Sequence, residues 1–381
     1  MGERRLFRYT CRGGVFPRCA TAKFVYAKSR VRSRRLRSTL FVAALFCWSV
    51  PAAAEAGASL VTAAYYGDFG KVEAIISDGY NVNVADEHGT TPLMAASQNG
   101  SVKIVKALIQ KGADVNATNS SGVAALIIAS TKGHADVATL LLDAGAKVDA
   151  ANNHGLTALM AASGNGKRDV VEVLLRKGAD LEARAKIGVT ALTLASMGGY
   201  REDVQLLLAH GANPNAKDNH GNTALMMATV KCRREVVEEL LAKGTNLDAR
   251  QNSGMTALML ASSMGCLEVI QDMLTHGAKI EARSDNGSTA LMWAVLNGQR
   301  DAEAELLARG ANVNARADHG VRALMLAALQ SRLDIVRDLL NNGADVNAKA
   351  DDGKDALMLA RDNAVRSLLT ETAARATNKK R

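Results

Sequence analysis

Two series of glycines recur every 33 residues through most of this chain, and they constrain its fold more than any other feature. One series runs from Gly89 to Gly353 and the other from Gly79 to Gly343, without an insertion in either. A fixed period of this length is typical of a stacked-repeat architecture, in which neighbouring units cover the apolar face that a single unit cannot bury. We therefore expect an extended stack of equivalent units.

Each unit is predicted to be a turn, two short helices and an extended return, as residues 86–118 illustrate. "DEHG" predicts a turn in which Gly89 takes a positive φ. Thr91 is the expected N-cap of the first helix, and Pro92 suits its first position because a missing N–H costs nothing there. The second helix, "SVKIVKALIQK", has an apolar face. Gly112 is its expected left-handed cap.

These residues resemble the ankyrin repeat. "GTTPLMAA" at Gly89 looks like the family's G-x-T-P-L-H-x-A, and "GADVNA" at Gly112 is nearly the family's loop, with the likeness extending over residues 57–370. The resemblance implies an all-α solenoid of about ten 33-residue units with short β-turn fingers. It divides the chain into a leader (1–54), an N-terminal capping repeat (55–85), eight full repeats (86–349) and a truncated C-terminal capping repeat with a frayed basic tail (350–381).

The leader carries the positive charge of the chain. The whole sequence has a formal charge of +9, but residues 1–54 alone hold twelve Lys and Arg against one acidic residue. The remainder is therefore −2, which argues against nucleic-acid binding by the folded body.

The order of features in the leader is typical of a secretory signal peptide. A run of arginines precedes an apolar stretch from Leu40 to Val50, and small residues follow it. Eleven apolar residues are too few for a spanning helix of about 20. We expect bacterial export to the periplasm or beyond, with a mature N-terminus at Glu55 or Gly57. The length of the leader leaves two alternatives open, a start site near Val31 and an organelle transit peptide.

Methionine occupies the column where the family's motif has histidine. The column reads Met94, Ile127, Met160, Thr193, Met226, Met259, Met292, Met325 and Met358. Thioethers bind Cu(I), but equivalent residues of stacked helices lie about 10 Å apart, too far for two sulfurs to share an ion. Methionine also fills irregular apolar gaps well. We favour packing over metal binding.

Other candidate chemistry is equally sparse, and we expect no catalysis and no cofactor. His88, His154, His220 and His319 precede turn glycines and are expected to be solvated fingertip residues. No phosphate loop, zinc spacing or nucleophile motif occurs. Cys11, Cys19 and Cys47 belong to the leader. Cys232 and Cys266 lie in adjacent units, and a stacking distance of about 10 Å exceeds the roughly 7 Å limit for a disulfide. We expect two unpaired thiols.

Function is therefore expected on the surface. In the ankyrin family, partners typically contact the turn tips, the residue after the turn glycine and the end of the first helix, all on a concave face. The matching residues here are Lys186, Ile187, Val189, Met197, Val230, Met255, Met264 and Leu296. Val123, Leu156, Val321 and Leu329 continue this mainly apolar series, which predicts a binding stripe, although packing would explain the same residues. Trp293 is expected in the core.

We interpret the chain as an exported, non-catalytic scaffold that binds another protein. It is expected to act as a monomer without a stable membrane span. The alternatives are a secreted effector acting on a host protein, and an enzyme accessory or metal-handling protein that uses the methionine column. The identity of the partner is beyond the sequence, because one scaffold serves unrelated partners.

Overall fold

The structure is a computed structural model that describes residues 52–378. The predicted leader lies outside the described residues apart from Ala52–Ala54, which belong to the first helix. The expected mature N-termini, Glu55 and Gly57, fall inside this helix, so cleavage at either position would shorten it.

The described residues form twenty α-helices in ten consecutive pairs, joined by fingers that contain one isolated antiparallel bridge, Thr118 to Ala124. The helices are α1 (Ala52–Tyr66), α2 (Phe69–Ser77), α3 (Pro92–Asn99), α4 (Val102–Gln110), α5 (Ala125–Lys132), α6 (Ala135–Asp143), α7 (Ala158–Gly164), α8 (Arg168–Arg176), α9 (Ala191–Gly198), α10 (Arg201–Ala209), α11 (Ala224–Val230), α12 (Arg234–Ala242), α13 (Ala257–Met264), α14 (Leu267–Thr275), α15 (Ala290–Asn297), α16 (Arg300–Ala308), α17 (Ala323–Leu329), α18 (Leu333–Asn341), α19 (Ala356–Leu359) and α20 (Asn363–Asn378). A 3-10 turn, Asp318–Gly320, precedes α17.

The predicted start signals of the first helices are confirmed. Thr91 has an extended backbone, and its hydroxyl accepts a hydrogen bond from the Met94 N–H, one of the donors that the helix leaves unpaired. Pro92 occupies the first position of α3, and Gly100 ends that helix at a φ of 83°. The threonine cap recurs at Thr157, Thr190, Thr223, Thr256 and Thr289.

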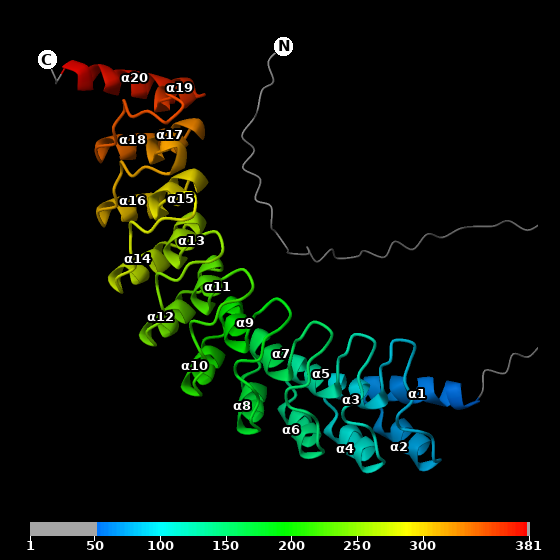
Figure 1. The fold of residues 1–381 in the computed structure, drawn as a ribbon. Helices are drawn as coiled ribbons and strands as arrows, with labels where there is room; N and C mark the ends of the chain where they lie inside the picture. Colours follow the sequence, from blue (N-terminus) through cyan, green and yellow to red (C-terminus); the bar gives the residue numbers. More distant parts are fainter. Residues whose placement is uncertain (1–51, 379–381) are drawn as a thin grey trace, which may run out of the picture. The chain divides into compact units, whose positions relative to one another are not determined.

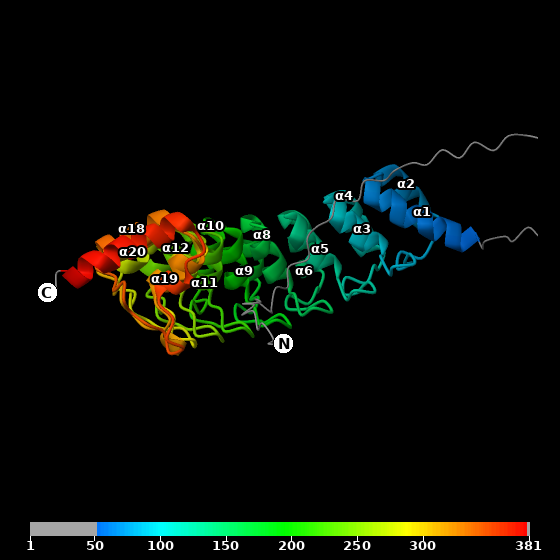
Figure 2. The same ribbon diagram turned by 90° about the horizontal axis from the view of Figure 1, so that it is seen from above.

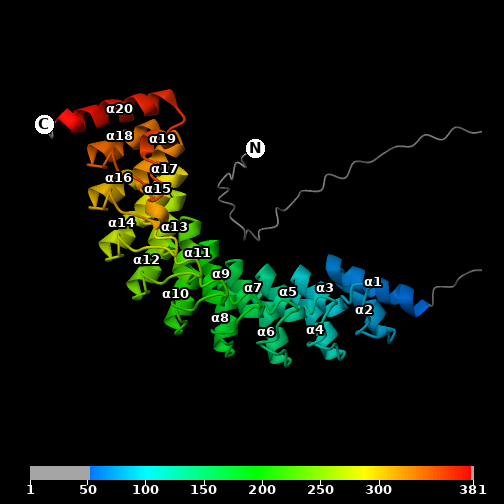
Figure 3. The same ribbon diagram turned by 45° about the horizontal axis from the view of Figure 1, so that its top comes forward.

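The helix pairs stack along one direction, so that each repeat contacts the next. First helices pack on first helices, as α3 does on α5, and second helices pack on second helices. The stack formed by residues 52–378 curves, with the odd-numbered helices on its inner side and the even-numbered helices on its outer side (Figures 1 and 3). One hydrophobic cluster extends from Leu60 to Leu369 through the whole stack.

The methionine column packs in this core, as predicted. Eight of its nine members, Met94 to Met325, are buried. The six methionines among them are at most 2% exposed, which argues against the metal-handling alternative. Met358 is the exception at 62% exposed, because it belongs to the last repeat and the next side chain of the column is missing.

The C-terminal cap differs from the expectation in one respect. The first helix of the last pair, α19, is only four residues long, consistent with the predicted truncation. The tail was expected to fray, but α20 continues to Asn378, and the last residues of the tail, 379–381, lie outside the described residues. Up to Asn378 this prediction is wrong, because Val365 and Leu369 are fully buried, and Leu368 and Ala373 pack against the core cluster. Their contacts stabilise a sixteen-residue helix whose composition looks polar.

Candidate interaction surface

Each finger that borders the inner side is a turn stabilised by hydrogen bonds within the finger itself. In the first full repeat, the Asp86 N–H donates to the Thr90 carbonyl, and the Asp86 carboxylate accepts from the His88 and Thr90 N–H groups. Asp218 makes the same contacts with His220 and Asn222. The aspartate at the start of the turn therefore caps it with its own side chain.

Main-chain hydrogen bonds also link each finger to the next. The Ser120 N–H donates to the His88 carbonyl at 3.0 Å, and seven equivalent bonds of 2.9–3.1 Å continue the series to Asp351 and His319. The fingers therefore form one row along an edge of the helices (Figure 2). The side chains of His88, His154, His220 and His319 are exposed beside this row, as predicted.

The predicted contact residues fall into two groups on the inner side. Lys186 and Ile187 lie at a fingertip, where Ile187 is 60% exposed, unusually high for an isoleucine. Met197, Val230, Met264 and Leu296 lie at the ends of the first helices α9, α11, α13 and α15. Met264 is 46% exposed, and the other three are half-buried.

Val189 does not belong to an exposed stripe, which corrects one predicted contact. Its side chain is 5% exposed and is part of the core cluster. Val189 follows the turn glycine, and its carbonyl accepts from the Ala185 N–H, so the chain already turns inward at this point. Met255 occupies the equivalent position in a later finger and is half-buried against the core. The residue after the turn glycine is therefore mainly a packing position here.

The inner ends of the first helices become more apolar along the stack. The equivalent position is Gln98, Thr131 and Gly164 in α3, α5 and α7, and then Met197 and Val230 in α9 and α11. Ser263 interrupts the column, but Met264 stands beside it, and Leu296 and Leu329 continue it. Trp293 is half-buried against the core, as predicted.

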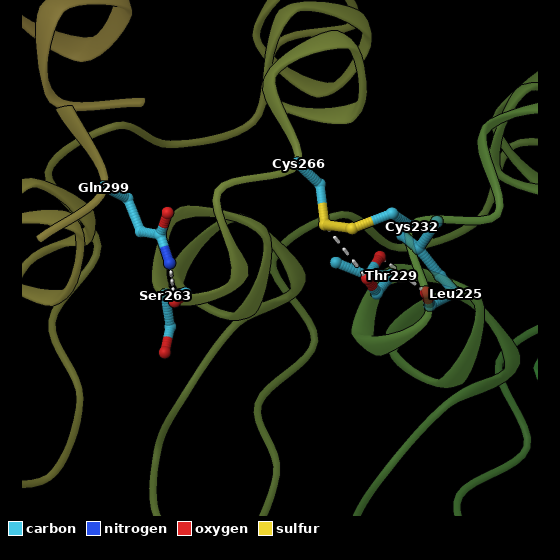
Figure 4. The surroundings of a disulfide bond; sticks show 6 residues. All are labelled: Leu225, Thr229, Cys232, Ser263, Cys266 and Gln299. Carbon is cyan, nitrogen blue, oxygen red and sulfur yellow. Dashed lines mark hydrogen bonds between the residues drawn. A yellow bond between two sulfur atoms is a disulfide. The ribbon is translucent and has the colours of Figure 1, made fainter. Parts of the chain in front are cut away.

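Cys232 and Cys266 form a disulfide, contrary to the expectation of two free thiols. Their Cα atoms are 5.5 Å apart, within the range that a disulfide spans. Figure 4 shows the bridge between the end of α11 and the start of α14, with the Cys266 sulfur 3.5 Å from the Thr229 carbonyl oxygen. The bond joins two adjacent repeats.

The stacking-distance argument failed because the two cysteines are 34 residues apart, not 33. Residues spaced by 33 are equivalent, but a residue 34 positions on lies directly over the glycine that ends the preceding first helix. A Cβ placed on Gly100 would lie 2.5 Å from the His134 ring, and Gly133 has Lys167 in the same place. The other members of this pairing are Gly166 with Tyr200, Gly199 with Arg233, Gly265 with Gln299 and Gly298 with Arg332. Cys232 replaces the glycine of one such pair, and Cys266 supplies the side chain that covers it. The 34-residue spacing of the two cysteines was the sequence signal for the disulfide.

Cys232 takes the left-handed backbone of the glycine that it replaces, at a φ of 49°. Ser331 occupies the same column and has a φ of 55°. Both residues therefore hold a backbone conformation that favours glycine.

Two buried carboxyl groups were missed by the sequence analysis. Glu303 of α16 is 0% exposed, and Asp203 of α10 is also buried. Neither Glu303 oxygen has a hydrogen-bond partner within the protein. Burial, reinforced by the nearby Asp338 charge, raises the pKa of Glu303 to about 7. Burial also raises the pKa of Asp203 to about 6, with a contribution from Glu202.

Within residues 52–378, no three His, Cys, Asp or Glu side chains are grouped so that they could hold a metal ion. None of the helices described is both long enough and apolar enough to span a bilayer.

Stacked helix pairs, hydrogen-bonded fingers and a partly apolar inner face define a repeat solenoid of the protein-interaction class. A family model for ankyrin repeats matches the chain in overlapping segments, residues 60–152, 116–185, 159–251, 192–284, 235–317, 279–350 and 305–380. The chain belongs to the ankyrin repeat family. Ankyrin repeats indicate a protein–protein interaction scaffold, and the family is typically non-catalytic. A search of curated proteins found no match.

Proposed function

We propose that this protein is an exported scaffold that binds a protein partner on the inner face of its stack and catalyses no reaction. The partner contacts the fingertips around Lys186 and Ile187 and the first-helix ends from Met197 to Leu296. The protein presents this face as a monomer.

The exposure of Ile187 and Met264 is the observation that carries the binding proposal. Both are large apolar side chains at positions that face solvent, 60% and 46% exposed. Neighbouring side chains of the same face, Met197 and Val230, are half-buried and apolar. Exposed apolar side chains on one face favour a binding site, because their burial against a partner is favourable.

The disulfide supports export. Structural disulfides persist in oxidising compartments and are rare where glutathione keeps thiols reduced. The Cys232–Cys266 bond and the signal-like leader are independent features that favour the same compartment. Mass spectrometry of the N-terminus of the native protein tests this step, and an intact Met1 on a reduced cytoplasmic chain would contradict it.

A photo-crosslinker tests the binding face. We expect benzoylphenylalanine at position 187 to give a discrete protein adduct in the native host. The same probe at position 102, an exposed apolar position on the outer helix α4, is expected to give none. The single change Met264→Gln should weaken the adduct at least about fivefold, since about 1 kcal/mol corresponds to that factor.

Met358→Gln is the matched control, because Met358 is also an exposed methionine but lies at the end of the stack. Equal adducts from positions 187 and 102, or an adduct that Met264→Gln leaves unchanged, would refute the proposed face.

A further inference from the structure

We infer that the partner presents an acidic, apolar segment to the fingers of Gly188, Gly221 and Gly254. This inference rests on the proposed function and narrows it to a class of partner. It follows from the distribution of charge along the row of fingers.

Positive charge is concentrated on three consecutive fingertips. The five residues that end at each of Gly188, Gly221 and Gly254 carry Arg184, Lys186, Lys217 and Arg250 against Asp218, a net charge of +3. The same segments of the three preceding fingers sum to −2, and those of the three following fingers sum to −1. The folded part of the chain is slightly acidic as a whole, so this excess is local.

Two of these four cations, Arg184 and Lys217, are held in place by neutral groups and keep their charge. The Arg184 guanidinium donates to the Gly188 carbonyl at 3.1 Å and to the Lys217 carbonyl at 2.6 Å, and the Lys217 ammonium donates to the Arg250 carbonyl at 3.0 Å. Neutral carbonyls orient the side chains across adjacent fingers. Arg250 is paired with Asp285 at 2.7 Å and therefore contributes less.

Asp218, the one acidic residue in these three segments, already accepts hydrogen bonds within its own finger. The Asp218 carboxylate accepts two main-chain N–H groups of its own turn, which directs one oxygen into the finger. Lys186 is exposed, so its charge remains available to a ligand.

The cations and the apolar side chains share the same part of the stack. Ile187 lies next to Lys186 on one fingertip. In the same repeats, Met197 is the penultimate residue of α9, and Val230 and Met264 are the last residues of α11 and α13. Polyanions such as nucleic acids need the cations but not the exposed apolar groups. A peptide segment that combines Asp or Glu with large apolar residues matches both features.

Peptide selection tests the inference with a defined probe. A phage-displayed library of random peptides is selected on the purified chain, and the enriched peptides are synthesised for affinity measurements. We expect them to combine acidic with apolar residues. Their affinity should fall about tenfold or more in Lys186→Glu/Lys217→Glu, and it should also fall with added salt.

Lys103→Glu/Lys106→Glu is the matched control, since it changes the charge equally on the exposed outer surface of α4. It should leave peptide affinity unchanged. Circular dichroism of both variants establishes that they are folded.

The outcomes separate the two proposals. The enriched peptides could lack acidic residues and still lose affinity in Ile187→Gln/Met264→Gln. That result would overturn the acidic partner but leave the proposed binding face intact. If none of the selected peptides loses affinity in this apolar variant, both the acidic partner and the proposed binding face would be overturned. Tight binding of an oligo-dT strand that requires Lys186 and Lys217 but tolerates Met264→Gln would identify a nucleic-acid surface and refute the inference.

Discussion

Glu303→Gln should stabilise this protein at neutral pH and have little effect in acid. Glu303 is fully buried in α16, and neither carboxylate oxygen has a protein partner. Every equivalent position in α4 to α18 is apolar, namely Val105, Ala138, Val171, Val204, Val237, Ile270 and Val336. Glutamine keeps the shape of the protonated glutamic acid but cannot ionise, so it isolates the contribution of the charge.

The size and sign of the effect follow from the pKa of Glu303. Burial raises it from 4.5 to about 7 in the folded chain. At 1.36 kcal/mol per pH unit, this displacement corresponds to a destabilisation of about 3 kcal/mol when the group is ionised in both states. Below pH 4.5 the group is protonated in both states and the difference vanishes. The stability of the wild type relative to Glu303→Gln should therefore fall as pH rises from 4.5 to about 7 and then level off.

Trp293 provides a local assay. It lies in α15 of the same repeat, and the only other tryptophan, Trp48, belongs to the predicted leader. A chain that begins at Glu55 therefore reports this repeat through one fluorophore, which matters because long repeat arrays need not unfold in a single step. Urea melts of both proteins are compared at intervals between pH 4 and 8.

Glu268→Gln is the control, because Glu268 is exposed on α14 and removal of its charge should shift stability little. A Glu303→Gln stabilisation of the same size at pH 4 and pH 8 would refute the reasoning, since it would show that ionisation of Glu303 is not the cause.

Ser331→Gly should stabilise the chain by about 1 kcal/mol in a urea melt, because Ser331 holds a left-handed backbone that glycine adopts without strain; no gain would contradict this. Cys232→Gly should show a similar gain in reducing buffer, but in oxidising buffer it also removes the bond to Cys266. Closure of a 34-residue loop is worth about 3–4 kcal/mol in the chain-entropy account, so the sign should reverse with redox conditions; an identical shift in both buffers would exclude the disulfide. Asp203→Asn should stabilise the chain in the same way as Glu303→Gln but over a lower pH range. In urea melts followed by circular dichroism, its stability relative to the wild type should grow from pH 3.8 to about 6 and then stay constant. A stability difference that does not change with pH would contradict the raised pKa of Asp203.

The repeat architecture was predictable because its signals recur. The 33-residue period, the cap at Thr91 and the left-handed glycine at Gly100 each appear in several units, so local propensity and long-range stacking agree. The burial of the methionine column was predictable for the same reason, because the column recurs in most of the repeats.

The sequence was a poorer guide to how deeply a side chain is buried and to features that occur in one repeat alone. Val189 and Ile187 are two residues apart on one finger, yet one is buried and the other is exposed, because the chain turns inward between them. The disulfide depended on an offset of one residue from the period, which an argument based on equivalent positions overlooks. Glu303 was visible as one acidic residue in an apolar column, but the absence of a partner for it depends on surrounding side chains that sequence spacing does not specify.

The disulfide also has a mechanical consequence. A stack of this kind, pulled at its two ends, should yield one repeat after another, because each repeat is held only by its neighbours. The Cys232–Cys266 bond carries the load past the 34-residue segment that it closes. At roughly 3.4 Å per extended residue, about 110 Å of chain is withheld from stretching while the bond is intact. Reduction would release that length, so the thiol chemistry of the surroundings would determine how far the protein extends under tension.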